Sequence, residues 1–281
     1  MKISLLIPAM NRPKELEKCL KSVFSSTRIP DEIIVSDDSD KHFEKEILKI
    51  CKSFKKVKYI KGPKKGLPAN ENHLLKFASN NFIVFLGDDN IVDRNYFQNM
   101  FKCYKKYSKI YGEKIIISGN EIRNGVEIYP GELTFLGYMA RKPKDFLNIH
   151  SIVICSTLFP KHLFNSVRFD ETYFYGYDEI DIALQAICKG YRIIFCPEII
   201  NFHNHSQVNR EKYKLVVEEA RLYEMLKVYS IYKRNILKFT IFFIISTLHI
   251  WIFGTKKGYF SLFITPFRAF KNFIHFYKNK R

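Results

Sequence analysis

The sequence lacks the short motifs that mark several large enzyme classes. Its 281 residues contain no Gly-x-x-x-x-Gly-Lys-Ser/Thr loop and no Gly-x-Gly-x-x-Gly run, which excludes the P-loop and dinucleotide fingerprints. No Gly-x-Ser-x-Gly elbow occurs, so a serine hydrolase of that type is excluded as well. A nucleotide site in this chain would have to rely on carboxylates and a metal ion.

Cysteine is scarce and scattered. The six cysteines form no Cys-x-x-Cys pair, which argues against a zinc ribbon or a disulfide scaffold. The pattern fits reduced, mostly buried thiols in the cytosol. Residues 3–8 enter a strand-like run at once, so we expect no signal peptide.

Acidic residues are missing from the last fifth of the chain. Residues 226–281 contain eleven Lys/Arg and no Asp or Glu, and so carry +11 of the net charge of +18. Residues 239–253 are uncharged and strongly apolar, but shorter than the ~20 residues that span a membrane. A second apolar stretch covers 258–267, and 268–281 alternate aromatic and basic residues.

This tail predicts interfacial or re-entrant association with an anionic membrane surface, on its cytoplasmic face. A tilted single span and a helical subunit contact are the alternatives. Nucleic-acid binding is disfavoured, because the charges bracket long apolar runs instead of lining a polar groove.

Strand-like and helix-like segments alternate along the first half of the chain. Strands separated by helices of this length are typical of βαβ units, so the sequence predicts an α/β fold with a doubly wound, mostly parallel sheet. The expected strands are 3–7, 32–35, 57–60, 82–86 and 114–118, and the expected helices are 13–25, 43–54, 68–78 and 95–107.

The alternation is lost between residues 119 and 174. A helix then follows the acidic cluster at 178–181 and stops at Gly190; a strand at 191–195 and a helix at 211–232 come next. We expect one domain over 1–205 and membrane-associating helices over 206–281.

Three acidic clusters carry the chemistry. Asp88-Asp89 follows the apolar run 82–86, and carboxylates at the exit of a buried strand suit a divalent cation that bridges to phosphate. Asp37-Asp38 ends the second strand, where a carboxylate can bind a base or ribose, although turn chemistry explains it too. The third cluster, 178–181, has three acids where helix capping needs one.

In their order and spacing, four motifs over residues 1–205 resemble those of the family 2 glycosyltransferases, which have a single nucleotide-binding α/β domain of the A-type glycosyltransferase fold. The matching segments are the opening strand and loop at 3–12, Asp37-Asp38-Ser39, the helix at 68–72 with 82–90, and 178–182.

The resemblance implies roles for donor binding. Pro8 and Ala9 would shape the base pocket, beside Asn11 and Arg12 of the same motif. Asp38, or else Asp37, would read uracil or thymine, and Asp88 would contact the ribose or the donor sugar. Asn72 would lie on the donor side, or instead satisfy backbone groups near the metal loop.

The resemblance also implies a metal site and a catalytic base. Asp89 would hold Mn²⁺ or Mg²⁺ on the diphosphate, together with His203 or its alternative, His205. Glu179 stands where the family places its base, with Asp178 beside it as the alternative. Two departures matter: Gly87 replaces the first acid of the usual Asp-x-Asp, and Glu replaces the usual Asp at the base position.

These features predict an inverting, metal-dependent glycosyltransferase that acts in surface polysaccharide biosynthesis. The donor would be a UDP- or dTDP-linked sugar, and the acceptor a hydroxyl of a glycan or lipid-linked molecule. A sugar-1-phosphate nucleotidyltransferase is one alternative, and a non-catalytic, membrane-bound scaffold that keeps the fold is the other.

Overall fold

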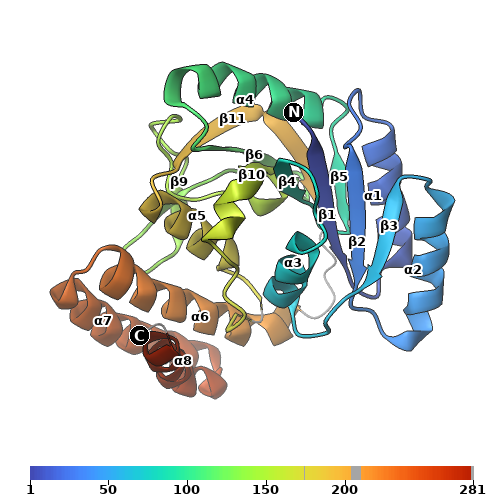
Figure 1. Cartoon of the computed structure of the whole chain (residues 1–281). Coiled ribbons are helices and arrows are strands. Elements are labelled where there is room, and N and C mark those ends of the chain that lie inside the picture. Colours follow the sequence, from blue (N-terminus) through green and yellow to red (C-terminus); the bar gives the residue numbers. More distant parts are fainter. Residues whose placement is uncertain (174, 204–209, 280–281) are drawn as a thin grey trace.

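A nine-stranded sheet with helices on both faces forms the centre of the molecule (Figure 1). The computed structural model describes residues 1–173, 175–203 and 210–279, without the side chains of 139–141 and 210–214. The strands of the sheet are β1 (Ile3–Ala9), β2 (Glu32–Asp37), β3 (Val57–Lys61), β4 (Phe82–Phe85), β5 (Asn90–Val92), β6 (Ile115–Arg123), β7 (Val126–Ile128), β10 (Thr157–Pro160) and β11 (Arg192–His203). A separate pair consists of β8 (Glu132–Leu133) and β9 (Met139–Arg141).

The strand order is β3-β2-β1-β4-β10-β6-β11-β5, with β7 beside β6. Pairing is parallel from β3 to β4 and again between β6 and β11. β10 runs antiparallel to both of its neighbours, and β5 antiparallel to β11. The predicted α/β fold with a mostly parallel sheet is confirmed.

Alternating side chains of the strands feed two cores, one on each face of the sheet. Leu5 and Ile7 pack with α1 (Pro13–Phe24), α2 (Lys41–Ser53) and α4 (Tyr96–Tyr111). Leu6 and Ile34 pack on the opposite face with α3 (Leu67–Leu75) and α5 (Asp178–Cys188). This alternation explains why the early strands read as continuous apolar runs: both of their faces are covered.

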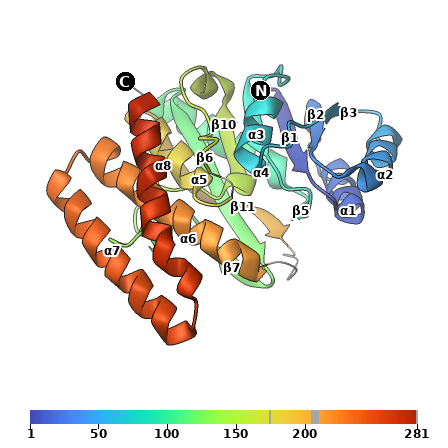
Figure 2. The same cartoon turned by 90° about the horizontal axis from the view of Figure 1, so that it is seen from below.

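A layer of three helices lies beside this domain, below the sheet in Figure 1 and side by side in Figure 2. It consists of α6 (Arg210–Lys227), α7 (Ile236–Lys257) and α8 (Thr265–Asn279), with a π-helical turn at Val228–Tyr232 after α6. Its own apolar cluster includes Leu226, Phe242 and Phe273. The expected domain boundary at 205/206 lies outside the described residues.

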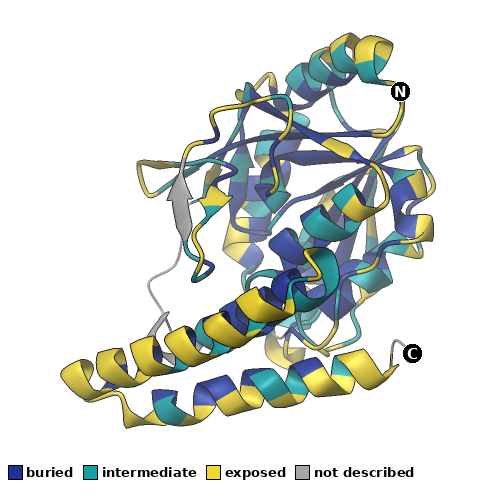
Figure 3. Cartoon of the chain, turned by 90° about the vertical axis from the view of Figure 1, so that its left-hand side faces the viewer, coloured by how far each residue is buried: buried dark blue, intermediate teal, exposed yellow. Residues whose placement is uncertain are grey.

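α7 buries one narrow stripe and exposes the rest. Phe242, Ser246, Ile250 and Gly254, spaced four apart, are its buried residues. Most of the remaining surface of α7 and α8 is exposed (Figure 3). By length and composition, α7 is the single helix among the described residues that could cross a membrane. Within its 18-residue apolar stretch, 17% is buried.

Two differences from the sequence prediction concern strand pairing, and a third concerns the end of a helix. β10 lies in the stretch 119–174, where no strand was expected, and it enters the middle of the sheet. β11 extends to His203, eight residues beyond its predicted end, through an irregularity between Phe195 and Ile200. The helix predicted to reach residue 232 ends at Lys227.

Candidate functional site

The Asp88–Asp89 turn is held rigidly at the carboxyl end of β4. The Asn90 side-chain amide donates to the side chain of Asn201 on β11. The Asn90 backbone N–H donates to the Gly87 carbonyl at 3.1 Å. A Cβ atom at residue 87 would lie 2.5 Å from the Asn90 side-chain oxygen. A side chain at position 87 would therefore require the Asn90 amide to move.

Arg12 supplies the positive charge that faces both carboxylates. Its guanidinium lies 2.6 Å from an Asp88 oxygen and also pairs with Asp89. The Met10 backbone N–H donates to Asp88 at 3.0 Å. Burial nevertheless raises the pKa of Asp88 to about 7, against the opposing effect of Arg12.

Asp89 and His203 lie together, as the metal prediction requires. His203 Nε2 is 3.2 Å from an Asp89 oxygen, and its Nδ1 is 3.2 Å from Glu121. Arg123 pairs with the same Glu121 oxygen at 2.7 Å. Although burial opposes the charge, the hydrogen bonds to both acids raise the pKa of His203 to about 9.

This donor set fits a divalent cation. A carboxylate oxygen and an imidazole nitrogen face each other, and a second carboxylate orients the far nitrogen, which is the arrangement that commonly supports metal-binding histidines. Glu121 was not predicted, because β6 was expected to end at residue 118. His205 lies outside the described residues.

The two acids that end β2 have different environments. Asp37 is buried, and its oxygens accept from the Ser39 N–H at 2.9 Å and the Tyr59 hydroxyl at 3.0 Å. Asp38 is half-buried and accepts from the Lys64 N–H at 2.7 Å. Asp37 is thus committed to the fold, whereas part of Asp38 remains accessible.

The β1–α1 loop joins these acids to the Asp88–Asp89 turn. Asn11 adopts a left-handed φ of 57°. Its N–H donates to the Ser39 hydroxyl at 2.7 Å, while Arg12, the next residue, binds Asp88. Ala9 lies in register with Asp37, with Pro8 half-buried beside it. The predicted donor-side residues Pro8, Ala9, Asn11, Arg12, Asp38 and Asp88 are therefore contiguous.

Asp178 and Glu179 begin α5. A third acid, Glu71 of α3, interacts with both of them and was not predicted. Glu71 is 2% exposed, and its Oε2 has no hydrogen-bond partner among the described residues. Burial and the neighbouring Glu179 raise the pKa of Asp178 well above its usual range. Burial also raises the pKa of Glu179, although its hydrogen bond with Asp178 and the charge of Arg123 act in the opposite direction.

Tyr175 connects the two groups of acids, since its pKa is raised first by burial and then by charges that include Glu179 and Asp89. Glu179 also lies within electrostatic range of Arg123 and Glu121, which belong to the His203 network. The clusters at Asp88–Asp89 and Asp178–Glu179 therefore both lie within electrostatic range of Tyr175, and Glu179 also of the Glu121 carboxylate that contacts His203.

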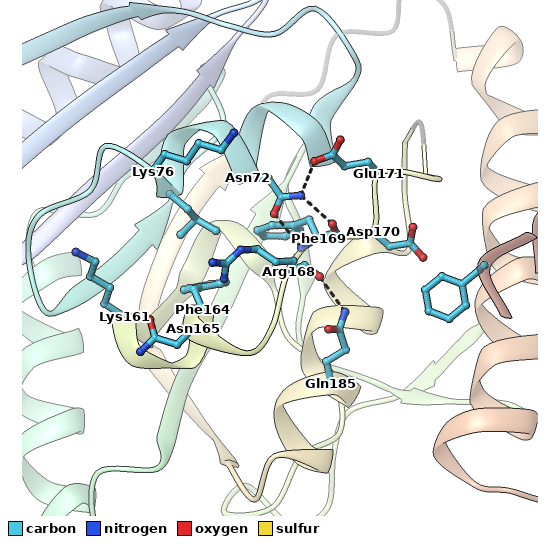
Figure 4. A pocket seen from close by; sticks show the side chains of 12 residues that line it. Asn72, Lys76, Lys161, Phe164, Asn165, Arg168, Phe169, Asp170, Glu171 and Gln185 are labelled. Carbon is cyan, nitrogen blue, oxygen red and sulfur yellow. Dashed lines mark hydrogen bonds between the residues drawn. The ribbon is translucent and has the colours of Figure 1, made fainter. Parts of the chain in front are cut away.

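Asn72, predicted either to lie on the donor side or to satisfy backbone groups, makes hydrogen bonds within the fold. Its side-chain nitrogen donates to the Phe169 carbonyl at 2.8 Å and to Glu171 at 2.9 Å, and its oxygen accepts from the Phe169 N–H at 3.1 Å. These bonds line a pocket of about 630 Å³ between α3, α5 and α8 (Figure 4). All of the hydrogen-bonding atoms of this amide thus hold the segment that leads towards α5.

Solved structures define the class of fold. The structure of TarS 1-349 from Staphylococcus aureus in complex with UDP-GlcNAc is similar, with a TM-score of 0.61 and 16% identity, over 82% of this chain and 66% of that one. GalNAc-T7 with UDP, GalNAc and Mn²⁺ has a TM-score of 0.66 and 16% identity, over 83% and 49%. The fold is that of the A-type glycosyltransferases.

The chain belongs to glycosyl transferase family 2, whose family model matches residues 4–168. A GalNAc(5)-diNAcBac-PP-undecaprenol beta-1,3-glucosyltransferase of Campylobacter jejuni is 29% identical over 188 residues, which are 62% of this chain and 56% of that protein. Glycosyltransferase GlyA of Streptococcus pneumoniae is 30% identical over 110 residues, 38% of this chain and 15% of that protein. The chain thus covers little more than half of the first relative and a small part of the second.

Proposed function

We propose that this protein transfers a sugar from a UDP- or dTDP-linked donor to a hydroxyl of a glycan or lipid-linked acceptor, with inversion at the anomeric carbon. One observation carries the proposal: a family 2 domain brings two clusters of acids, one of them with an arginine and a histidine, within electrostatic range of the same tyrosine, Tyr175. The lipid-linked acceptor is supported by the name of the Campylobacter relative.

The donor nucleotide would lie along β1 and β2. Asp38 would accept from the base, because Asp37 is engaged by Ser39 and Tyr59. Arg12 would bind the diphosphate of the donor. To do so, its guanidinium would leave Asp88 and Asp89, with which it pairs in this structure. Asp88, whose pKa is raised to about 7 by burial, would hydrogen-bond the ribose or sugar hydroxyls.

Asp89 and His203 would hold Mn²⁺ or Mg²⁺. When bound, the ion supplies neutralising charge for the diphosphate leaving group. Glu121 contributes by orienting the imidazole, and Arg123 by fixing Glu121.

Glu179 is the better candidate for the base of the two residues that begin α5. Burial raises the pKa of both residues, and the two carboxyl groups share a hydrogen bond, so the pair holds a proton more readily than free carboxyl groups do. Because Glu179 stands at the base position of the family motif, we assign the shared proton to Asp178, with Glu179 as the carboxylate that accepts its hydrogen bond. That carboxylate would take the proton of the acceptor hydroxyl as its oxygen attacks the anomeric carbon.

A transfer assay with Asp89→Ala tests this proposal. We expect wild-type protein with Mn²⁺ to release UDP or dTDP from a nucleotide sugar, and EDTA to stop the release. Asp89→Ala should lose at least ~100-fold in kcat/KM, because the ion and its charge compensation are lost together. Glu46→Gln, an exposed acid on α2, is the matched control and should keep full activity.

Two outcomes would favour the rival functions. Pyrophosphate release from a nucleoside triphosphate and a sugar phosphate would assign a nucleotidyltransferase, although the family match favours transfer. Wild-type protein that binds UDP with Mn²⁺ but turns over no nucleotide sugar would indicate a scaffold.

We also propose that the exposed side of α7 and α8 binds the cytoplasmic face of a membrane. Exposed side chains of α7 include Ile244, Leu248 and Ile252, each more than half exposed. Basic residues flank them and no acid occurs after residue 226, so an anionic bilayer is the complementary partner. Because the buried stripe of α7 packs on its neighbours, the helix would lie in the interface instead of crossing the bilayer.

Flotation with phosphatidylglycerol and with phosphatidylcholine vesicles tests this surface. We expect binding to the anionic vesicles that weakens about tenfold or more with Leu248→Glu/Ile252→Glu, since each glutamate would have to enter the interface. The control is Lys52→Glu, at an exposed position of α2. Undiminished binding by the double variant, or a stable dimer that hides these residues in solution, would overturn the assignment.

A further inference from the structure

A second group of charges also includes a residue of the first turn of α5, Asp181. Lys227, the last residue of α6, is fully buried, and its Nζ lies 2.6 Å from Asp181, 3.0 Å from Asp170 and 3.7 Å from Glu224. It is the single cation in this group among the described residues. Three carboxylates around one ammonium form a network that is stable only if its hydrogen bonds are satisfied.

Tyrosines complete this network. The hydroxyl of Tyr232 donates to Asp181, that of Tyr173 to Glu224, and that of Tyr223 to Asp170 at 2.7 Å. The ammonium also lies 4.7 to 5.2 Å from three aromatic rings, with Phe276 of α8 the nearest at 4.7 Å. The network therefore joins α6, the π-helical turn and α8 to the catalytic domain.

The residues of this network lie on both sides of Asp178 and Glu179 in the sequence. Asp170 and Tyr173 precede the loop that leads into α5, and Asp181 follows Glu179 by two residues. Lys227 thus holds both ends of the short segment 170–181, which carries Asp178 and Glu179. The Asn72 contacts at residues 169 and 171 fix the start of the same segment from α3.

We propose that Lys227 is a positioning residue: through Asp181 and Asp170 it fixes the Asp178–Glu179 pair, so that the C-terminal helical layer is a working part of the catalytic site. This inference rests on the proposed function, since it assigns the pair a role in transfer. It assigns the basic residue Lys227 an internal role, unlike the exposed lysines of the tail.

The linkage is also electrostatic. The negative charge of Asp181 is one of the causes that raise the pKa of Asp178, and Lys227 at 2.6 Å offsets that charge. Removing the lysine would strengthen the field at the pair, whereas removing Asp181 would weaken it. The other groups that face the pair are Glu71 from α3, Glu121 and Arg123 from β6, and Tyr175 from the preceding loop.

The test compares Tyr232→Phe with Tyr229→Phe. Both hydroxyls belong to the same π-helical turn, but that of Tyr232 donates to Asp181 and that of Tyr229 to the Phe135 carbonyl. We expect Tyr232→Phe to lower kcat by about three- to tenfold with an unchanged donor KM, and to move the acidic limb of the pH–rate profile upward. Tyr229→Phe should leave both unchanged.

Asp181→Asn should shift the acidic limb of the pH–rate profile in the opposite direction. It removes the negative charge, so the acidic limb should move downward, while Lys227→Met should move it upward by about one pH unit or more. In the double variant Lys227→Met/Asp181→Asn, the limb should return towards wild type. A role confined to packing predicts shifts of the same sign, or none, in these variants.

Hydrogen exchange gives a readout without turnover. Amides of 170–181 should exchange faster in Tyr232→Phe than in Tyr229→Phe at equal thermal stability. Equal exchange and equal pH profiles in the two tyrosine variants would overturn the positioning role, even if Lys227→Met fails to fold. An inactive wild type with the exchange difference intact would overturn the proposed transfer reaction but not the linkage.

Discussion

Two groups of acids include residues of the first turn of α5, and they differ in one respect: among the described residues, one group surrounds a lysine and the other contains no cation. On the side of α6, Asp170, Asp181 and Glu224 surround Lys227. On the side of α3, burial and then the charges of Asp178 and Glu179 raise the pKa of Glu71, and burial and then the charge of Glu179 raise the pKa of Asp178. Arg123, whose positive charge acts on Glu179, already pairs with Glu121.

Burying acids without a partner costs stability, so the difference between the groups indicates different uses. The group around Lys227 is satisfied within the chain and holds elements together. The pKa values of the group around Glu179 are raised, so these acids take up protons more readily than free carboxyl groups do, which suits a site that must accept a proton or a ligand's hydroxyls. Three substitutions sharpen or break this comparison.

Glu179→Gln should have the largest effect. We expect kcat to fall by about 10²- to 10⁴-fold, because the amide cannot take the acceptor's proton. Binding of UDP with Mn²⁺, followed by thermal shift, should be retained, since the donor residues lie on β1, β2 and the Asp88–Asp89 turn. If Asp178→Asn loses more activity than Glu179→Gln, then Asp178 is the base.

Lys227→Met should have the next largest effect, on stability. It leaves three carboxylates without their cation, two of them fully buried (Asp181 and Glu224), so urea unfolding should show a loss of about 3–5 kcal/mol in the free energy of unfolding. Lys52→Met, at an exposed position of α2, should change this value little. A loss as small as that of the control would place the network outside the folded core.

Glu71→Gln should have the smallest effect, and of the opposite sign. Burial beside two acids raises the pKa of Glu71 well above its usual range. The unfolded chain therefore releases this proton at lower pH than the folded chain does. The contribution of Glu71 to stability is full below about pH 4 and is lost as the pH rises towards the raised pKa.

The variant should thus match wild type near pH 4 and exceed it by about 1–2 kcal/mol in the free energy of unfolding at pH 7–8. Urea titrations at several pH values measure this difference. Glu46→Gln is the exposed control, and its curve should run parallel to wild type. A destabilised Glu71→Gln at pH 8 would mean that the carboxylate has a partner that offsets its charge.

Much of the domain follows from local patterns. Apolar runs that end in acids mark β2 and β4, and parallel strands bring their carboxyl ends to one edge, so the proximity of Asp38 to Asp88 and Asp89 could be predicted. The family resemblance is confirmed in the same part of the chain. The roles of Asp89, His203 and Glu179 stay predictions.

What could not be predicted depends on contacts between distant segments. Nothing near Thr157 indicates that β10 enters the middle of the sheet, because its partners lie about 40 and 75 residues away in sequence. Glu71 is one acid within a helix of mixed polarity, and only the packing of α3 against α5 gives it a role. Lys227 begins a basic tail, where a lysine is ordinarily solvated, yet it is fully buried.

Trp251, the single tryptophan of the chain, lies on the partly exposed side of α7, and its indole N–H donates to the Phe263 carbonyl at 3.2 Å. Tryptophan fluorescence, excited at wavelengths that tyrosine does not absorb, therefore reports on the surroundings of this one helix. Titration with lipid should shift the emission maximum of Trp251, whereas titration with nucleotide should leave it unchanged. The same measurement therefore distinguishes the two ligands without a label.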